Sequence, residues 1–346
     1  MIPGVGGVPQ NTAQKVLYIG GFGRSGSTLV ERILGQLPGF CSAGEIVFLW
    51  QRGLIEGQLC GCGTPVPECD FWTRVGKCAF GGWDEIDAHE MVALQRRVDR
   101  NRFIPAMVAP RLRPQAQADL DRYTQALSKL YRAIGEVAGA RVVIDASKHA
   151  STAFLLRKVP GIDLRVVHLV RDSRGVAYSW TKEVKKPEVT GDDAFMPVYS
   201  PSSSGRQWVA YNLLFDALGV VGAVHVGGTP RPPGTMVLRY EALMAQPRQG
   251  LERILAHAGE PVTADAFSFL GESPGGPGVS PGNDWVELGC DHTVAGNPMR
   301  FHQGRLDLRL DQAWTTKLPA RDRKVVTAIT WPLQLRYGYS RRNANV

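Results

Sequence analysis

Residues 17–34 read LYIGGFGRSGSTLVERIL: an apolar run, a glycine-rich turn and an amphipathic segment. The apolar run starts after Lys15 and ends in glycines, and apolar residues after the turn recur at helical spacing until a Pro-Gly pair. This order predicts a strand, a loop and a helix. The loop nearly matches the Walker A signature, but Ser27 occupies the position of the lysine and Arg24 lies inside the loop.

The loop is suited to a phosphate- or sulfate-type anion. Backbone N–H groups of residues 24–28 would point into the turn, and the following helix would place the positive end of its dipole there. Gly23 and Gly26 permit an anion to approach closely. The alternative interpretation is a glycine-rich turn without a ligand. The missing lysine disfavours a conventional ATPase or GTPase, in which that charge contacts the β- and γ-phosphates.

Strand and helix patterns alternate along most of the chain. Strands are expected at 15–23, 141–147, 163–172 and 235–243, and helices at 25–39, 44–57, 84–100, 115–137, 150–161, 173–184, 205–221 and 321–339. This alternation predicts a P-loop-like α/β fold, a mostly parallel sheet with helices on both faces. We expect a loose leader at 1–14 and one domain at 15–340, with a helical, cysteine-rich insertion at about 58–138 that begins as an irregular knob. The polar stretch 185–205 is expected to form a loop or lid.

Length and charge narrow the classes of function. The chain has 346 residues, enough for one large α/β domain, and its formal net charge of +8 favours anionic ligands. Basic residues are scattered rather than gathered in an arm, which disfavours nucleic acid. The N-terminus has no signal-peptide pattern, and the most apolar window, 213–228, is too short to span a bilayer. Six cysteines in so long a chain do not suggest a secreted scaffold, so we expect a cytoplasmic protein.

A second motif lies in residues 166–180, VVHLVRDSRGVAYSW. The strand delivers Arg171 to its C-terminal end, where parallel sheets bind ligands, and Ser179 follows eight residues later. A bidentate guanidinium and a hydroxyl suit a second phosphate. Taken alone, the Arg-Asp pair at this strand end also fits a structural ion pair. Together with the first loop, it indicates a ligand with two separated anionic groups.

These motifs resemble those of sulfotransferases that use 3′-phosphoadenosine 5′-phosphosulfate (PAPS). In that family a loop like GRSGSTL holds the 5′-phosphosulfate, and an Arg with a Ser eight residues later, as in RDSRGVAYS, holds the 3′-phosphate. The segment LRYEALMAQP resembles a family segment whose Tyr contacts the adenine side. The resemblance spans residue 15 to the C-terminal helix. It implies these donor-binding residues: Gly23, Arg24, Ser25, Gly26, Ser27, Thr28, Arg171, Ser179, Tyr240 and Arg300.

The RSG(S/T)T loop is similar to that of the branch with tyrosylprotein and many bacterial sulfotransferases, and this implies the catalytic groups. In CSAGEIVFL, Glu45 takes the place of the general base, and in VVIDASKH, Lys148 joins Arg24 in stabilising the transferring group. His149 is an alternative base. The other interpretation of Glu45 is a helix-start carboxylate stabilised by the helix dipole. The resemblance implies sulfuryl transfer without a metal.

Two regions depart from the family pattern. The late basic loop of the family is replaced by HTVAGNPMRFHQGRLDLRLDQAW, in which Arg300 and Arg305 are the candidates for the 3′-phosphate and His292 and Asn297 for the transferred group. The other region is the knob. Its cysteines are Cys60, Cys62, Cys69 and Cys78. They would suit zinc in type but not in standard spacing, so a disulfide or buried thiols are favoured and no metal is assigned.

Two other functions compete with a PAPS-dependent sulfotransferase. A small-molecule or nucleotide kinase with an altered loop is the rival enzyme, and an adenine-nucleotide sensor without catalysis is the rival from another class. The acceptor is left open among sugars, lipids, phenolic natural products and peptides, and the oligomeric state is open too. We expect the acceptor pocket to be built from the helices at 84–137 and the lid at 185–205.

Overall fold

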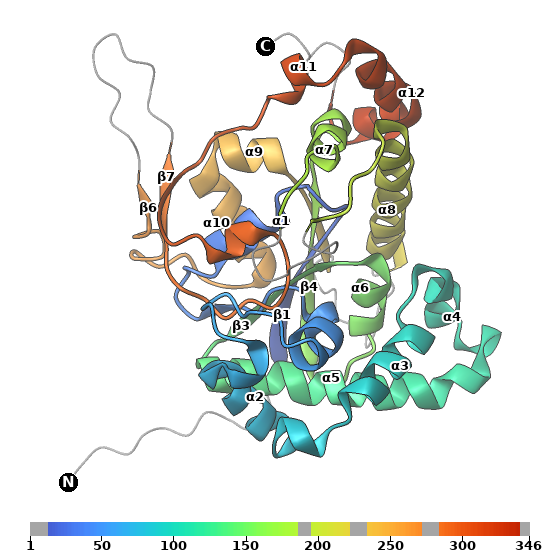
Figure 1. The fold of residues 1–346 in the computed structure, drawn as a ribbon, viewed down its shortest axis with the longest axis vertical. Helices are drawn as coiled ribbons and strands as arrows, with labels where there is room; N and C mark the ends of the chain where they lie inside the picture. The colour runs from blue at the N-terminus through green and yellow to red at the C-terminus, as the bar shows by residue number, and fades with distance from the viewer. Residues whose placement is uncertain (1–12, 186–194, 222–233, 272–283, 340–346) are drawn as a thin grey trace.

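The computed structural model describes residues 13–185, 195–221, 234–271 and 284–339. Its centre is a five-stranded parallel sheet in the order β2-β3-β1-β4-β5. The strands are β1 (Gln14–Gly20), β2 (Phe40–Ser42), β3 (Val142–Lys148), β4 (Ile162–Val170) and β5 (Thr235–Arg239). β1 lies between β3 and β4, so the glycine-rich turn leaves the middle of the sheet (Figure 1).

Alternate residues of the strands bury opposite faces of the sheet. Val16 and Tyr18 of β1 belong to one apolar core, whereas Leu17 and Ile19 belong to the other. The first core includes α5 (Gln117–Ala138), α6 (Ala150–Leu156) and α8 (Pro201–Val221). The second includes α1 (Ser27–Leu34), α9 (Tyr240–Ala245) and α10 (Pro247–Ala258). Helices therefore cover both faces, and the predicted α/β fold class is confirmed.

A third layer packs outside α8. In Figure 1, α7 (Ser173–Trp180), α8 and α12 (Ala320–Arg336) lie side by side, and they contact one another in pairs. Their shared apolar cluster includes Trp208 and Phe22, which lies in the glycine-rich loop after β1. The short α11 (Trp314–Lys317) contacts α7. The C-terminal helix thus supports the element that follows β4.

The segment 58–138 is more regular and more central than its sequence indicates. It contains α2 (Asp70–Phe80), α3 (Ala88–Val98), α4 (Ile104–Val108) and α5. The expected irregular knob is therefore wrong over 70–80, where an apolar stripe on α2 packs against α5. Because α5 buries Leu130 and Ile134 against the strands, it forms one wall of the main core.

Several other boundaries differ from the sequence-based expectations. The helix expected at 44–57 is a 3₁₀ turn, Ile46–Phe48, followed by a π-helical segment, Leu49–Ile55. A small antiparallel sheet of β6 (Leu270–Gly271), β7 (Trp285–Leu288) and β8 (Gly304–Asp307) was not expected. Most of the leader and residues 186–194 of the lid lie outside the described residues. Within the described part of the chain, no helix has the length and apolar character needed to cross a bilayer.

Candidate active site

A cavity of about 660 Å³ opens where β1, β3 and β4 end. In a parallel sheet the loops at these carboxyl ends converge, which makes this edge the usual ligand site. Nine of the residues expected from the sequence line the cavity: Gly23, Arg24, Gly26, Ser27, Thr28, Glu45, Lys148, Arg171 and Ser179. Most of the predicted donor and catalytic residues are thus brought together around one space.

The glycine-rich loop leaves the start of α1 open toward the cavity. Gly26, at the N-cap of α1, has φ 92° and provides no capping side chain, so the first N–H groups of the helix are not capped by one. A Cβ at Gly26 would lie 2.6 Å from the ring of Tyr240, so a larger residue would clash. Ser25 is buried and donates to the carbonyl of Phe22 at 2.7 Å, which stabilises the turn rather than lining the cavity.

Arg24 is a half-buried cation with unused hydrogen-bonding capacity. Its Nε and Nη2 atoms are buried and have no hydrogen-bond partner among the described residues. The guanidinium lies over the ring of Trp180, 5.2 Å from its centroid. Burial lowers the pKa of Arg24, and the charge of Glu45 opposes this shift. Buried donors that lack a partner are costly, and an anion at the loop would satisfy them.

Glu45 and Lys148 form an ion pair on the cavity wall. Lys148 Nζ lies 2.5 Å from Glu45 Oε1 and also donates to the carbonyl of Ala146 at 2.9 Å. The two side chains are 12% and 16% exposed, so the pair is screened from bulk water while still facing the cavity. Lys148 has φ 69° in the last residue of β3, a conformation that turns its side chain out of the strand pattern.

The turn that carries Glu45 is clamped from two sides. Gly44 donates its N–H to Oε1 of Glu31 on α1 at 2.6 Å, and Glu45 donates its N–H to the carbonyl of Val294 at 2.7 Å. The residue after Val294 is Ala295, which has φ 53°. Ala295, Arg24 and Lys148 are the non-glycine residues with positive φ in the described ranges 13–185, 195–221, 234–271 and 284–339. Such strain, about 1–3 kcal/mol per residue, concentrates at functional sites.

Two buried charges of α1 were missed by the sequence reasoning. Glu31 is fully buried, and burial followed by the charge of Asp291 raises its pKa to about 8. Arg32 pairs with Asp291 at 2.5 Å and donates to the carbonyls of Gly289, Arg300 and His302. These contacts fasten the segment after β7 onto the anion-loop helix. The sequence did carry a signal for them, because Glu31 and Arg32 are adjacent charged residues among the apolar residues of the predicted helix.

Arg171 lies where the second anion was expected. Its Nη1 donates to the carbonyl of Arg24 at 3.2 Å, and its Nη2 lies 3.2 Å from both the carbonyl and Oδ2 of Asp311. The guanidinium covers the ring of Tyr240 at 4.8 Å. Tyr240 is buried between Arg171 and the loop and does not line the cavity. Asp311 was not expected here, and Ser179 faces the same cavity.

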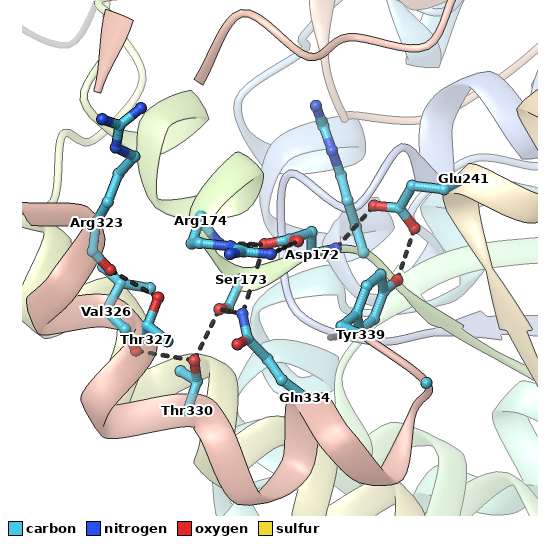
Figure 2. A network of polar contacts seen from close by, with 12 residues as sticks. Asp172, Ser173, Arg174, Glu241, Arg323, Val326, Thr327, Thr330, Gln334 and Tyr339 are labelled. Carbon is cyan, nitrogen blue, oxygen red and sulfur yellow. Dashed lines mark hydrogen bonds and ion pairs between the residues drawn. The ribbon is translucent and has the colours of Figure 1, made fainter. Parts of the chain in front are cut away.

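A buried polar network fixes the residues next to Arg171 (Figure 2). Asp172 caps α7 and forms a bidentate pair with Arg174, with bonds of 2.9 and 2.6 Å. Gln334 of α12 donates to the hydroxyl of Ser173 at 2.5 Å, and that hydroxyl lies 2.8 Å from the hydroxyl of Thr330. The backbone of Asp172 also donates to Glu241, whose other oxygen accepts from Tyr339. The end of β4 is therefore held by the C-terminal helix.

The late loop contributes residues other than the expected arginines. Arg300 is buried, does not line the cavity, and donates to the carbonyls of Thr293 and Leu59 at 2.9 and 2.8 Å. Arg305 pairs with Asp307 at 3.4 Å on the exposed surface. Asn297 and Arg309 line the cavity instead. The basic side chain on this wall is thus Arg309, which sequence spacing did not single out.

The two histidines considered as bases lie in different places. His149 lines the cavity, and its ring packs edge-on against Phe48 at 5.8 Å. Burial lowers the pKa of His149, which favours the neutral imidazole. His292 does not line the cavity; its Nδ1 lies 3.3 Å from the sulfur of Cys69. Only His149 is placed to act as an alternative base.

Aromatic side chains form one part of the remaining cavity wall. Trp180 packs on Tyr199 at 4.5 Å, and Phe22 packs on Tyr211 at 5.4 Å, with all four side chains facing the cavity. Among the described residues, none from 58–138 lines it. The expected contribution of the helices at 84–137 to an acceptor pocket stays a prediction.

No protein-family model matches the chain, and no curated protein matches it. Solved structures that resemble it are sulfotransferases. A sulfotransferase domain from the olefin synthase of Synechococcus PCC 7002 is 18% identical, with a TM-score of 0.45, and the match covers 94% of this chain and 96% of that one. The sulfotransferase domain of the curacin biosynthetic pathway is 14% identical, with a TM-score of 0.42 and coverage of 95% and 99%. A sulfotransferase from Mycobacterium tuberculosis H37Rv is 15% identical, with a TM-score of 0.36 and coverage of 75% and 71%.

Proposed function

We propose that the protein is a PAPS-dependent sulfotransferase that transfers a sulfuryl group to a hydroxyl or amine. The observation that carries the proposal is one cavity that joins an uncapped helix start, the unpartnered donors of Arg24 and the Glu45–Lys148 pair. These groups supply what sulfuryl transfer requires: fixed positive charge at the transferred group and a carboxylate for the acceptor proton.

The residues divide the reaction between them. The loop N–H groups and Arg24 hold the phosphosulfate, so that the bond between sulfur and the bridging oxygen points at the acceptor. Glu45 takes the proton of the acceptor as its oxygen or nitrogen bonds to sulfur and the bridging S–O bond breaks. Lys148 moves from Glu45 to the bridging oxygen and stabilises the charge that remains on the bisphosphate product. No step requires a divalent metal.

The second anion site would distinguish a 3′-phosphate. Arg171 is held by Asp311, which is itself on the cavity wall, so a bound phosphate replaces the carboxylate as the partner of the guanidinium. Ser179 supplies a hydroxyl beside it. Because the phosphate must displace Asp311, the affinity for the bisphosphate is lower than an unpaired Arg171 would give. The preference over a nucleotide that lacks the 3′-phosphate remains.

The acceptor side favours a ring or an apolar body beside the reacting hydroxyl. Trp180, Tyr199 and Tyr211 offer ring faces to such a group. Phenolic natural products, tyrosyl peptides, lipids and sugars with apolar faces all belong to this class. We propose no nucleic acid partner and a cytoplasmic location.

The decisive binding experiment compares two nucleotides. Calorimetry should show that 3′-phosphoadenosine 5′-phosphate binds about 10–100-fold more tightly than AMP, because charge-assisted hydrogen bonds contribute roughly 1.5–3 kcal/mol each. Arg171→Ala should abolish most of this difference, whereas Arg305→Ala, an exposed arginine outside the cavity, should keep it. Equal affinity of the unaltered protein for both nucleotides would refute the assignment.

Transfer itself is tested with labelled PAPS and a cell extract, followed by mass analysis of the product. Turnover should persist during a brief exposure to EDTA. Loss of turnover that magnesium restores would instead support a kinase. Circular dichroism of the same samples shows whether any loss reflects unfolding.

A further inference from the structure

Four potential metal ligands gather on the side of the 3₁₀ and π-helical segment away from the cavity. We call them the cysteine–histidine cluster: Cys60, Cys62, Cys69 and His292. Their three sulfurs and one ring nitrogen all lie within 4.8 Å of one another, and none of the four residues lines the cavity. Cys78, which the sequence grouped with these cysteines, is exposed and outside the cluster, and a histidine more than 200 residues away takes the fourth place.

Four of the six separations between the ligand atoms fit a tetrahedral zinc site. A tetrahedron with zinc–sulfur bonds of about 2.3 Å and zinc–nitrogen bonds of about 2.0–2.1 Å has sulfur–sulfur edges of about 3.8 Å and sulfur–nitrogen edges of about 3.5 Å. Here Cys69 Sγ lies 3.7 Å from the sulfurs of both Cys60 and Cys62. His292 Nδ1 lies 3.3 Å from Cys69 Sγ and 3.7 Å from Cys60 Sγ.

A disulfide, one of the two arrangements favoured from the sequence, does not account for the cluster. A disulfide would leave one cysteine and the histidine without a role, and all six cysteines of the chain are free. Of the two expected arrangements, the disulfide is not formed, and Cys60 and Cys69 are buried free thiols.

The histidine is held in place by the same segment. Its ring stacks on Phe71 at 4.8 Å and 8° between planes, and the indole of Trp72 donates to its carbonyl at 2.8 Å. These contacts orient Nδ1 toward the sulfurs.

We propose that the cysteine–histidine cluster binds one structural zinc ion. Four protein ligands close the coordination sphere, which distinguishes a structural site from a catalytic one. The ion joins residues 60–69 to the loop at 292–294, and the carbonyl of Val294 accepts the N–H of Glu45. Zinc therefore fixes the backbone behind the proposed base without taking part in transfer, and the proposal does not depend on which reaction the cavity performs.

The test measures the zinc content of the purified full-length chain. Elemental analysis should find about one zinc per chain, as a closed four-ligand site implies. Cys69→Ser and His292→Ala should lose the metal, whereas Cys78→Ser should keep it. His292→Cys, which restores a fourth ligand as a thiolate, should retain zinc and so separate coordination from packing.

A second measurement does not depend on the variants folding. Exchange of the unaltered protein into cobalt should give a thiolate-to-cobalt charge-transfer band and the intense visible bands of a tetrahedral site, and added zinc should abolish both. The proposal is overturned if the reduced protein binds neither zinc nor cobalt. It is equally overturned if Cys69→Ser and His292→Ala keep zinc, or if Cys78→Ser loses it to the same extent.

Discussion

The cavity wall and the network behind Arg171 contain the same kinds of side chain but differ in how they are satisfied. In the network of Figure 2, the buried guanidinium of Arg174 meets both oxygens of Asp172. On the cavity wall, Arg24 keeps two buried nitrogens without a partner, and both it and Lys148 have positive φ. The two regions meet at the end of β4, where Arg171 lines the cavity and the next residue, Asp172, belongs to the network.

This difference distinguishes a structural charge from a functional one. A complete set of partners stabilises the fold and leaves nothing for a ligand. Unused donors and backbone strain cost stability, and they are retained where a ligand supplies the compensation. We therefore expect substitutions in the cavity wall to change the rate with little effect on stability, and substitutions in the network to do the reverse.

The largest expected effect is on the rate. Glu45→Gln should reduce kcat by ~10²–10⁴, because it removes the proposed general base. The free energy of unfolding should change by about 1 kcal/mol or less, since the glutamine keeps an oxygen that can accept the hydrogen bond from Lys148 Nζ. The loss of rate should be smaller for a phenol than for an alcohol, because the phenol ionises more easily. Rates for both acceptors and a denaturant titration of the same preparation give these quantities.

Lys148→Met is the matched control, because it breaks the same ion pair while leaving the carboxylate. It should lower kcat without the dependence on acceptor acidity. Near-normal turnover of Glu45→Gln on an alcohol would transfer the base role to His149, the alternative proton acceptor that lines the cavity. Glu45 would then be a carboxylate that only stabilises its turn.

A large effect on stability is expected in the network. Asp172→Ala leaves the buried guanidinium of Arg174 without its carboxylate and should lower the free energy of unfolding by about 3–5 kcal/mol. Urea titrations measure the change. The double variant Asp172→Ala/Arg174→Met should be more stable than the single one, because the unpaired charge is gone. A loss below about 1 kcal/mol for Asp172→Ala would end the contrast between the two regions.

The remaining expected effect depends on pH and concerns Glu31 on α1. The pKa of Glu31 is raised from 4.5 to about 8 by burial, so the folded state keeps a proton that the unfolded state has lost. Stability therefore falls as pH rises from 4.5 to about 8 and is constant above that range. Glu31→Gln keeps an acceptor for the N–H of Gly44 and should remove this fall. At alkaline pH it should be more stable than the unaltered protein, because the buried carboxylate is gone.

Unfolding free energies at acidic, neutral and alkaline pH check this prediction. Glu56→Gln on the exposed surface should leave the pH profile unchanged. A profile for Glu31→Gln that parallels that of the unaltered protein would show that Glu31 is ionised in the folded state.

Much of the fold was predictable because it follows from local patterns. The apolar runs that form β1, β3 and β4 are long, and glycine or a strand-end charge marks where each stops. β2 and the small antiparallel sheet were missed because their strands have two to four residues, too short for alternation to show. The π-helical segment after Phe48 has an apolar pattern that a regular helix would share.

The site was predictable where its residues lie within one motif. Arg24, Arg171 and Ser179 follow strands whose ends must converge. Their positions after those strands were therefore enough to predict that they share one site. Arg300 was misplaced because the late loop is irregular, and only tertiary contacts decide that its guanidinium turns to backbone carbonyls. His292 joins cysteines far from it in the chain, and no spacing rule connects them.

The contacts of Arg32 have a consequence for how the protein is made. The guanidinium on α1 meets the carbonyl of Arg300, 268 residues further along the chain. At ribosomal elongation rates, on the order of 10–50 s separate the synthesis of these two partners. During that interval α1 has left the ribosome with two charges that the finished protein buries, and the anion loop lacks its second wall. A nascent chain stalled before Asp291 should therefore be sensitive to proteases around the loop, and binding of nucleotide should begin only after the last quarter of the protein has been translated.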